Sequence, residues 1–353
     1  MDWTALSGLR LAVESCEYER LSAPLAYGRE RVTTLLHLRG GGEEGLSEDV
    51  GVMEDDKDAL HVTKPDLGLA GEWTLGSLCE HLHATDQFPV EPSWEVMRRW
   101  RNWAFESAAL DLALRQAGRA LHEVLGREPR PLRFVNSLGL GEEPSFDPIR
   151  RRLEHHPGLR FKVDAHPAWT PELIAELAAT GAVDIVDFKG AYGLEVTDEA
   201  ALIRMYERVV RAFPDALLED PHDLPEVTAL LEGERHRISY DAPIHTAADI
   251  DAQRFAPRAV NIKPCRVGDI RSLLDVYATV AERGLVTYGG GMGELSVGRG
   301  QIQLLASLFH PDGPNDTAPS GYNADIPAPE LPASPLDPQP ERIGFRRRND
   351  IPQ

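Results

Sequence analysis

Charged residues end successive apolar runs in the second half of the chain. Carboxylates end three of them, because Asp187 closes VDIVD, Glu219 closes ALLE and Asp241 closes ISYD. Lysines stand in two others, Lys162 in FKVD and Lys263 at the end of AVNIK. A few hard oxygen ligands suit Mg²⁺, which leaves its other positions to water and substrate. A lysine beside such a cation can act as a base near neutral pH, so these residue types predict metal-assisted removal of a proton next to a carboxylate.

The spacing of these residues fits one strand and one helix for each charge. Asp187 precedes Glu219 by 32 residues, and steps of 22 residues lead from Glu219 to Asp241 and from Asp241 to Lys263. Segments of helical periodicity, such as PELIAELAATG and IRSLLDVYATVAERG, lie between the apolar runs. This alternation indicates βα units around a parallel sheet, whose strands end at one common mouth. The three carboxylates and Lys263 are therefore expected to converge.

A structural role for such charges is the alternative. A single acidic residue at a strand end is more often a helix cap or a surface ion-pair partner, and we place Asp184, Asp220 and Asp269 in that class. Four charged ends in successive units are less easily accidental. On spacing alone, a metal site and a purely structural set of charges are equally supported.

The N-terminal part has a different pattern, in which strands precede helices. The expected strands are 8–17, 30–39 and a piece near 48–52, with the turn-like GGGEEG at 40–45, and the expected helices are 74–86 and 93–124. They indicate an α+β domain over residues 1–130 with an antiparallel sheet of about three strands and a long connection at 18–29.

The βα alternation begins at Leu132, where LRFVNSLGL is the first expected strand. The next six strands are expected at 161–164, 183–189, 215–219, 237–241, 259–263 and 285–288, and a helix at 297–309. An eighth strand has only a short candidate near Asn315–Ala318, so the barrel, over residues 131–320, should have an irregular last strand. The proline-rich tail at 321–353 should run extended over the surface or be partly loose.

Composition limits the partners. The formal net charge of −20 argues against binding a phosphate backbone. Three scattered cysteines without a CxxC pair suit a reducing compartment, and Cys265 reads as a small buried residue. No apolar run is long enough to span a membrane, and the N-terminus does not resemble a signal peptide. We expect a soluble, cytoplasmic protein with no nucleic-acid or membrane partner.

Taken together, the motifs resemble the enolase superfamily. VTTLLHLRGGGEEGLSE, then SAALDLALRQAGRALHEVLG, then a barrel with Lys, Asp, Glu, Asp and Lys in that order are similar to its mandelate racemase/muconate lactonizing enzyme-like group. That group includes o-succinylbenzoate synthases and dipeptide epimerases. The resemblance covers about residues 8–320. It implies an α/β fold, an enolase-like modified (β/α)7β TIM barrel with an N-terminal α+β capping domain, and a Mg²⁺ cofactor. It also implies a small carboxylate substrate and a homo-oligomer.

The resemblance implies roles for particular residues. Asp187, Glu219 and Asp241 match the three metal ligands, Lys263 matches the lysine of the sixth strand, and Lys162 falls in the KxK motif of the second. Four further residues would contact or orient the substrate: Glu294 resembles the glutamate after the seventh strand, Tyr27 lies in the segment that matches the mobile loop over the site, and His245 and Arg266 follow strands five and six.

Two residues depart from the family pattern. The second lysine of KxK, usually an acid/base residue, is Asp164, and the asparagine more often found two residues after the third-strand aspartate is Lys189. Side chains two apart share a strand face, so both should project into the mouth. Asp164 could pair with Lys189 or with Lys263 and hold it charged. Alternatively, Lys189 could supply the missing second ammonium.

The expected activity is that of a metal-dependent lyase or isomerase of this superfamily. Lys263 would abstract the proton α to a substrate carboxylate, and the metal would stabilise the enediolate. Elimination of the dehydratase or synthase type is favoured, because Asp164 replaces the second base. A racemase, epimerase or cycloisomerase with lysines on both faces is the alternative, and a non-catalytic barrel that binds a small anion is the alternative of another class.

Overall fold

The computed structural model describes residues 3–24, 30–51, 60, 64–88, 90–141, 143–192 and 198–348. Its N-terminal part holds two antiparallel sheets. One pairs β1 (Arg10–Val13) with β5 (Gly71–Thr74), and the other has the order β2 (Ser15–Pro24), β3 (Glu30–Gly40), β4 (Glu43–Asp49). The three-stranded sheet was expected, but β2 continues to Pro24, so half of the connection predicted at 18–29 is strand. The predicted turn at 40–45 lies at the β3–β4 hairpin.

The helices of this part are α1 (Trp3–Ser7), α3 (Leu75–Ala84), α4 (Val96–Gln116) and α5 (Leu121–Leu125). The helix predicted over 93–124 is therefore two helices. Gly118 separates them with a φ of +63°, a left-handed conformation that ends α4 and that glycine adopts without steric cost. Helix α4 is buried from Trp103 to Leu114, which is why its sequence shows apolar residues on nearly every side.

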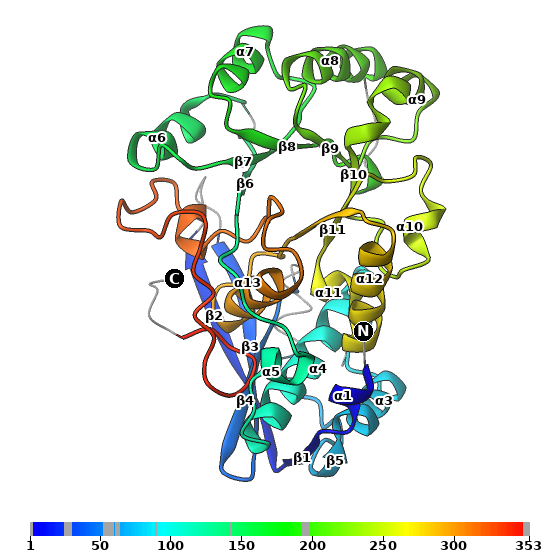
Figure 1. The fold of residues 1–353 in the computed structure, drawn as a ribbon, viewed down its shortest axis with the longest axis vertical. Helices are drawn as coiled ribbons and strands as arrows, with labels where there is room; N and C mark the ends of the chain where they lie inside the picture. Colours follow the sequence, from blue (N-terminus) through cyan, green and yellow to red (C-terminus); the bar gives the residue numbers. More distant parts are fainter. Residues whose placement is uncertain are drawn as a thin grey trace.

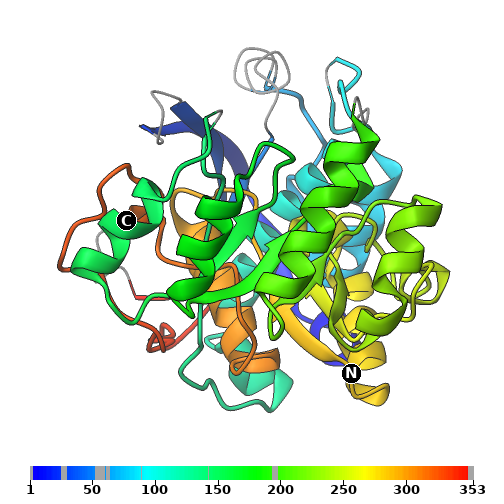
Figure 2. The ribbon, with the colours of Figure 1, turned by 90° about the horizontal axis from the view of Figure 1, so that it is seen from above.

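The remainder is a curled parallel sheet of seven strands in chain order, which confirms the predicted fold class. The strands are β6 (Asn136–Leu138), β7 (Phe161–Asp164), β8 (Val183–Asp187), β9 (Leu217–Glu219), β10 (Ile238–Tyr240), β11 (Ala259–Ile262) and β12 (Val286–Gly289). The helices between and after them are α6 (Asp147–His155), α7 (Pro171–Ala179), α8 (Glu199–Ala212), α9 (Pro225–Leu231), α10 (Asp249–Ala252), α11 (Pro264–Val267), α12 (Ile270–Glu282) and α13 (Val297–Phe309). Helices α7, α8 and α9 lie on the outer side of the strands (Figures 1 and 2).

An irregular segment closes the barrel where an eighth strand would stand. Asn315 forms a parallel bridge with Phe134, just before β6, and Asp316 forms one with Gly290, just after β12. The two edges of the seven-stranded sheet are thus joined through residues 315–316, within the short candidate for an eighth strand. His310 fixes this segment, because its Nδ1 lies 2.6 Å from Oδ1 of Asn315.

Protonation of His310 should weaken the closure. Burial lowers the pKa of His310 to about 4, whereas an unfolded histidine titrates near its ordinary value of about 6.5. Above a pH of about 6.5 the histidine is neutral in both the folded and the unfolded state. As the pH falls toward 4, the unfolded chain gains a proton that the folded chain does not bind, so the folded state loses about 3 kcal/mol. Denaturant unfolding of wild type and His310→Gln at pH 7.5 and about pH 4.5 tests this. The wild type should lose more stability than the variant, and equal losses would contradict the prediction.

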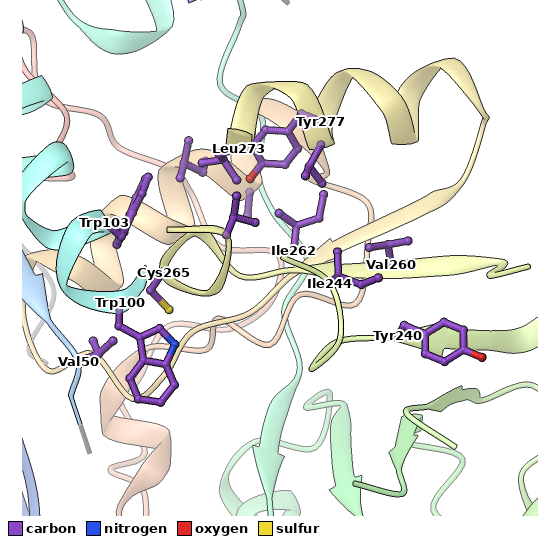
Figure 3. Packing of buried hydrophobic residues seen from close by; sticks show 14 of the residues in the cluster. Val50, Trp100, Trp103, Tyr240, Ile244, Val260, Ile262, Cys265, Leu273 and Tyr277 are labelled. Atoms are coloured by element: carbon purple, nitrogen blue, oxygen red, sulfur yellow. The ribbon is translucent and has the colours of Figure 1, made fainter. Parts of the chain in front are cut away.

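The capping domain and the barrel share one apolar core. Figure 3 shows Val50, after β4, and Trp100 and Trp103 of α4 gathered near Cys265 of α11. Cys265 is buried, and burial raises the pKa of its thiol to about 12, as suits the small packing residue expected from the sequence. Since Cys265 follows Lys263 by two residues, this interface fixes the backbone beside the site.

The C-terminal tail runs extended but is anchored. Beyond the 3-10 turn η4 (Ser320–Asn323), Leu336 and Phe345 are fully buried. The buried carboxylate of Asp111 in α4 accepts the backbone N–H of Phe345 at 2.7 Å. No helix in the described part of the chain combines the length and apolar character needed to cross a membrane.

Candidate active site

Three carboxylates meet at the mouth of the barrel. Asp187 and Glu219 are the last residues of β8 and β9, and Asp241 directly follows β10. All three are fully buried, and one oxygen from each lies within 4.8 Å of the other two. Among the described residues, this is the one acidic cluster whose geometry could hold a metal ion. The predicted convergence is therefore observed.

Neighbouring side chains orient these carboxylates. The hydroxyl of Tyr288, on β12, donates to Oε2 of Glu219 and also contacts Ser239 at 3.0 Å. Asp220 accepts the backbone N–H groups of Asp241 and Ala242 at 2.8 and 2.9 Å. The prediction that Asp220 is a surface or capping residue was therefore wrong. It is fully buried in a left-handed conformation with φ of 47°, and its carboxylate holds the backbone that carries a candidate ligand.

The other two residues assigned structural roles have them. Asp184 pairs with Arg160, and Asp269 caps α12 by accepting the backbone N–H of Ser272 at 2.7 Å. Neither lies among the residues of the mouth. The distinction between Asp220 and these two depends on which way each strand end turns, which a single sequence does not show.

Lys263 stands beside Asp241 on one side of the mouth. Its Nζ lies 2.8 Å from Oδ2 of Asp241, and the guanidinium of Arg266 donates to the other oxygen. Burial lowers the pKa of Lys263, the Asp241 carboxylate and other neighbouring groups raise it, and the net shift is upward. Gly290 makes room for the lysine, since a Cβ there would come within 2.6 Å of its Cε. A residue with a side chain at this position would displace the lysine from the mouth.

Lys162 lies inside the carboxylate cluster. Its side chain is 1% exposed, and its Nζ contacts Glu219, lies 3.1 Å from Oδ2 of Asp187 and lies 3.9 Å from Oδ2 of Asp241. A fourth carboxylate, Asp316 of the closing segment, is 4.0 Å away. Burial lowers the pKa of Lys162, but Asp187 and Glu219 reverse this and hold it well above its usual range. The ammonium is charged and occupies a position that attracts cations.

The two residues that depart from the family pattern face each other. Nζ of Lys189 lies 2.5 Å from Oδ2 of Asp187 and 3.2 Å from Oδ1 of Asp164. Of the pairings left open by the sequence, the structure brings Asp164 to Lys189. Lys189 has a left-handed backbone with φ of 57°, uncommon for a residue with a side chain. Tyr192 lies below its ammonium, 5.5 Å from Nζ to the ring centre.

The donor set fits a divalent cation. Six carboxyl groups and four cations make up the mouth: Asp164, Asp187, Glu219, Asp220, Asp241 and Asp316, with Lys162, Lys189, Lys263 and Arg266. The formal charge of −2 is what one such ion would balance. Burial and neighbouring carboxylates raise the pKa of Glu219 well above its usual range and that of Asp220 to about 6, as expected where negative charge is in excess. Oδ2 of Asp241 is buried and accepts no well-aligned hydrogen bond, although Nζ of Lys263 is near.

The remaining predicted site residues lie around this centre. Glu294 is buried; its Oε1 accepts the backbone N–H of Met292 at 2.8 Å and its Oε2 faces Arg299 at 3.3 Å. His245 is half-buried, with Nδ1 3.2 Å from the backbone oxygen of Arg266. Tyr27 lies outside the described residues. The side chains of Glu294 and His245 therefore contact groups around the mouth rather than the three carboxylates.

The capping domain holds the loop that carries Glu294. Arg31 of β3 donates to the backbone oxygens of Met292 and Gly293 at 2.7 and 3.0 Å. Glu48 of β4 is buried and accepts the backbone N–H groups of Leu295 and Ser296 at 2.5 and 2.9 Å. The sequence offered no signal for either contact, because each joins residues more than 240 positions apart.

A pocket of about 440 Å³ opens beside Asp164. Its wall includes the segment after β6, helix α6 and residues 293–295 and 323–325. Three successive arginines of α6 have different environments. Arg150 pairs with Asp147 and Glu154 on the surface, and Arg152 is buried against Asn136. Arg151 is half-buried, lines the pocket, and has no hydrogen bond or ion pair with any described residue.

Comparison with solved structures places this fold. The chain superposes on a muconate lactonizing enzyme from Pseudomonas fluorescens, complexed with muconolactone, with a TM-score of 0.70 at 18% identity, over 95% of each chain. A dipeptide epimerase from Methylococcus capsulatus, complexed with a Mg ion, gives 0.64 at 20% identity, over 87% of this chain and 90% of the other.

Sequence comparison adds relatives of known activity. An N-succinylamino acid racemase from Thermus thermophilus is 28% identical over 95% of this chain and 94% of its own. An o-succinylbenzoate synthase from Geobacillus stearothermophilus is 27% identical over 72% of this chain and 69% of its own. The chain is thus similar in fold to members of the enolase superfamily, and the sequence relatives are enzymes.

Two family models then match nearly the whole chain. They are described as the N-terminal domain and the C-terminal domain of a domain of unknown function, DUF8230, and they cover residues 4–124 and 128–324. The chain belongs to this family. Its description names no reaction, so the activity must be argued from the site.

Proposed function

We propose that the protein is a Mg²⁺-dependent lyase or isomerase that removes the proton α to a substrate carboxylate. The observation that carries this is the meeting of Asp187, Glu219 and Asp241 within 4.8 Å, with Lys263 beside them. Those three carboxylates would hold the ion. When bound, Mg²⁺ would anchor the substrate carboxylate and offset the negative charge that develops as the α proton leaves.

The chain's own groups then divide the work. Lys263 takes the α proton at Nζ, on the side of the mouth formed by β11. Lys162 keeps its positive charge beside the substrate carboxylate and stabilises the extra negative charge there. Asn261 and Tyr288 hold Glu219 in place through contacts with its Oε2. Deep burial of these groups excludes water and strengthens each of these interactions.

Elimination with a single base is the favoured reaction. On the side opposite Lys263, the ammonium of Lys162 on the second strand lies among the carboxylates, and that of Lys189, just after the third strand, is held by Asp187 and Asp164. Both lysines are thus committed to ion pairs with two or more carboxylates, and among the described residues no other lysine lies on that face. Racemisation or epimerisation is the second candidate, favoured by the similarity to an N-succinylamino acid racemase over nearly both full chains. A cycloisomerase reaction would use the same metal and lysines.

The test is solvent deuterium exchange. A panel of N-acylamino acids and other small carboxylates is incubated in D₂O with Mg²⁺, and again with EDTA, and the α position is followed by NMR. Metal-dependent exchange or elimination supports the proposal. Calorimetry with Mg²⁺ is run alongside. If neither exchange nor a Mg²⁺ site is found, the non-catalytic barrel that binds a small anion replaces the proposed function.

The pocket beside Asp164 is the place for the rest of the substrate. The names of two relatives contain a succinyl group, which ends in a second carboxylate. Arg151, in the pocket wall, forms no hydrogen bond or ion pair with a described residue, although the Asp147 carboxylate is near enough to interact with it, so we assign it to a terminal carboxylate of that kind.

Replacing Arg151 should change selectivity rather than chemistry. A charge-assisted hydrogen bond contributes about 1.5–3 kcal/mol, so Arg151→Gln should lower kcat/KM for an N-succinylamino acid by roughly 10–100-fold. The N-acetyl form of the same amino acid should be affected less than threefold. Arg150→Gln is the matched control, because Arg150 is not part of the pocket wall and already pairs with Asp147 and Glu154. Equal losses for both substrates would show that Arg151 does not read the distal carboxylate.

A further inference from the structure

The Lys189–Asp164 pair points to a control on metal binding. We propose that the Lys189 ammonium competes with the divalent cation for Asp187, and that Asp164 receives this ammonium when the cation binds. The inference rests on the proposed function, because it takes Asp187 as a ligand of the cation. It concerns the two positions at which the chain departs from the family pattern.

Both oxygens of Asp187 are engaged by Lys189. Its backbone N–H donates to Oδ1 at 2.9 Å, and its Nζ donates to Oδ2 at 2.5 Å. The N–H contact can persist in the presence of a cation, because it leaves the outward lone pairs of the carboxylate unused. The ammonium of Lys189 would be repelled from this position, because the ammonium of Lys162 already lies 3.1 Å from the same Oδ2 and a divalent cation would add two more positive charges beside both. Binding at Oδ2 therefore requires Nζ to move.

Asp164 is placed to take the ammonium. Its Oδ1 lies 3.2 Å from Nζ of Lys189, is buried, and accepts no well-aligned hydrogen bond from any described residue. A buried carboxylate oxygen without a hydrogen bond is costly, so it should gain from a closer ammonium. A small rotation of the flexible lysine side chain would shift Nζ from Asp187 to Asp164. The charge on Lys189 stays paired in both positions.

Lys162 does not have this freedom. Its ammonium also touches Oδ2 of Asp187, at 3.1 Å, but it contacts Glu219 as well, and its side chain is 1% exposed. The side chain of Lys189 is 31% exposed. The mobile competitor is therefore Lys189, and Asp164 is a positioning residue that acts through it.

Calorimetric titration with Mg²⁺ tests the inference without any substrate. Lys189→Met removes the competing charge and keeps the length of the side chain, so it should tighten Mg²⁺ binding by about tenfold or more. Asp164→Asn leaves Lys189 with Asp187 alone, so it should weaken binding by about tenfold or more. The double variant should bind as tightly as Lys189→Met, because Asp164 has no separate effect. Asp184→Asn is the control, because Asp184 lies on the same strand as Asp187 but pairs with Arg160. The Mg²⁺ affinity of this variant should equal that of the wild type.

The outcomes separate the inference from the proposed function. If the wild type binds Mg²⁺ and both single variants stay within threefold of it, the competition does not exist. If the double variant binds as weakly as Asp164→Asn, the aspartate acts on the ion directly and the inference is wrong. If Mg²⁺ binds to none of the proteins, including Lys189→Met, the proposed metal function fails and the inference fails with it. Thermal unfolding tests whether each variant is folded. If Asp164→Asn does not fold, the Mg²⁺ affinity of Lys189→Met alone decides whether the competition exists.

Discussion

Lys263→Ala is expected to lower the rate of α-proton exchange by about 10²–10⁴-fold, the usual contribution of a positioned acid or base. Of the metal-ligand candidates, Lys263 forms an ion pair with Asp241. Lys162 touches all three candidates, and Lys189 is held between two carboxylates. Removing the Lys263 amine leaves these contacts intact, so the loss should fall on the chemical step.

The measurement is NMR exchange of the best substrate from the panel, in D₂O with Mg²⁺, together with Mg²⁺ calorimetry. Metal affinity should be unchanged or slightly higher in Lys263→Ala, because a positive charge has left the side of Asp241. Cys265→Ala is the control, as this buried neighbour packs toward the capping domain. Exchange that survives in Lys263→Ala at more than a tenth of the wild-type rate would move the base to another residue.

The strands of the barrel were predictable because each carries its own signal. A short apolar run that ends in a charge marks both the strand and the direction of its last side chain, and β7 and α13 have the bounds expected from the sequence. Elements shaped by distant contacts were less visible. The break in the helix at Gly118 and the length of β2 depend on packing against the rest of the capping domain. The closing segment at 315–316 has no hydrophobic pattern of its own. It is held instead by His310 and by backbone bridges to distant residues.

The residues of the site also fall into a predictable and an unpredictable group. The identities of the strand-end residues placed Asp187, Glu219 and Asp241 together, since parallel strands end at one edge. The partners of each charge were not predictable, because they depend on rotamers and strand register. Asp316 went unnoticed for that reason, as it reaches Lys162 from a segment without strand periodicity. Arg151 is one of three successive arginines, and only their different burial in the fold distinguishes it from the other two.

Exchanging the charges at the two divergent positions is expected to add a second base. Asp164→Lys combined with Lys189→Asn restores the family pattern, with two lysines on the second strand and an asparagine after the third-strand aspartate. A lysine at 164 shares the strand face of Lys162 and projects into the mouth. With asparagine at position 189, Asp187 no longer forms an ion pair with a side chain at that position. The new lysine can approach the α carbon from the face opposite Lys263.

With one base, the wild type should exchange deuterium into one enantiomer of a substrate about 100-fold faster than into the other. The double variant should exchange both enantiomers at rates within tenfold, and should interconvert them, as chiral chromatography would detect. The single variants are the controls, because Asp164→Lys adds a third ammonium group near Asp187, beside those of Lys162 and Lys189, and Lys189→Asn leaves positions 164 and 189 without a lysine. Racemisation by the wild type at a rate equal to its exchange would show that the ion pairs of Lys189 open during turnover. The Asp164–Lys189 pair would then act as the second base, and the racemase reading would replace elimination.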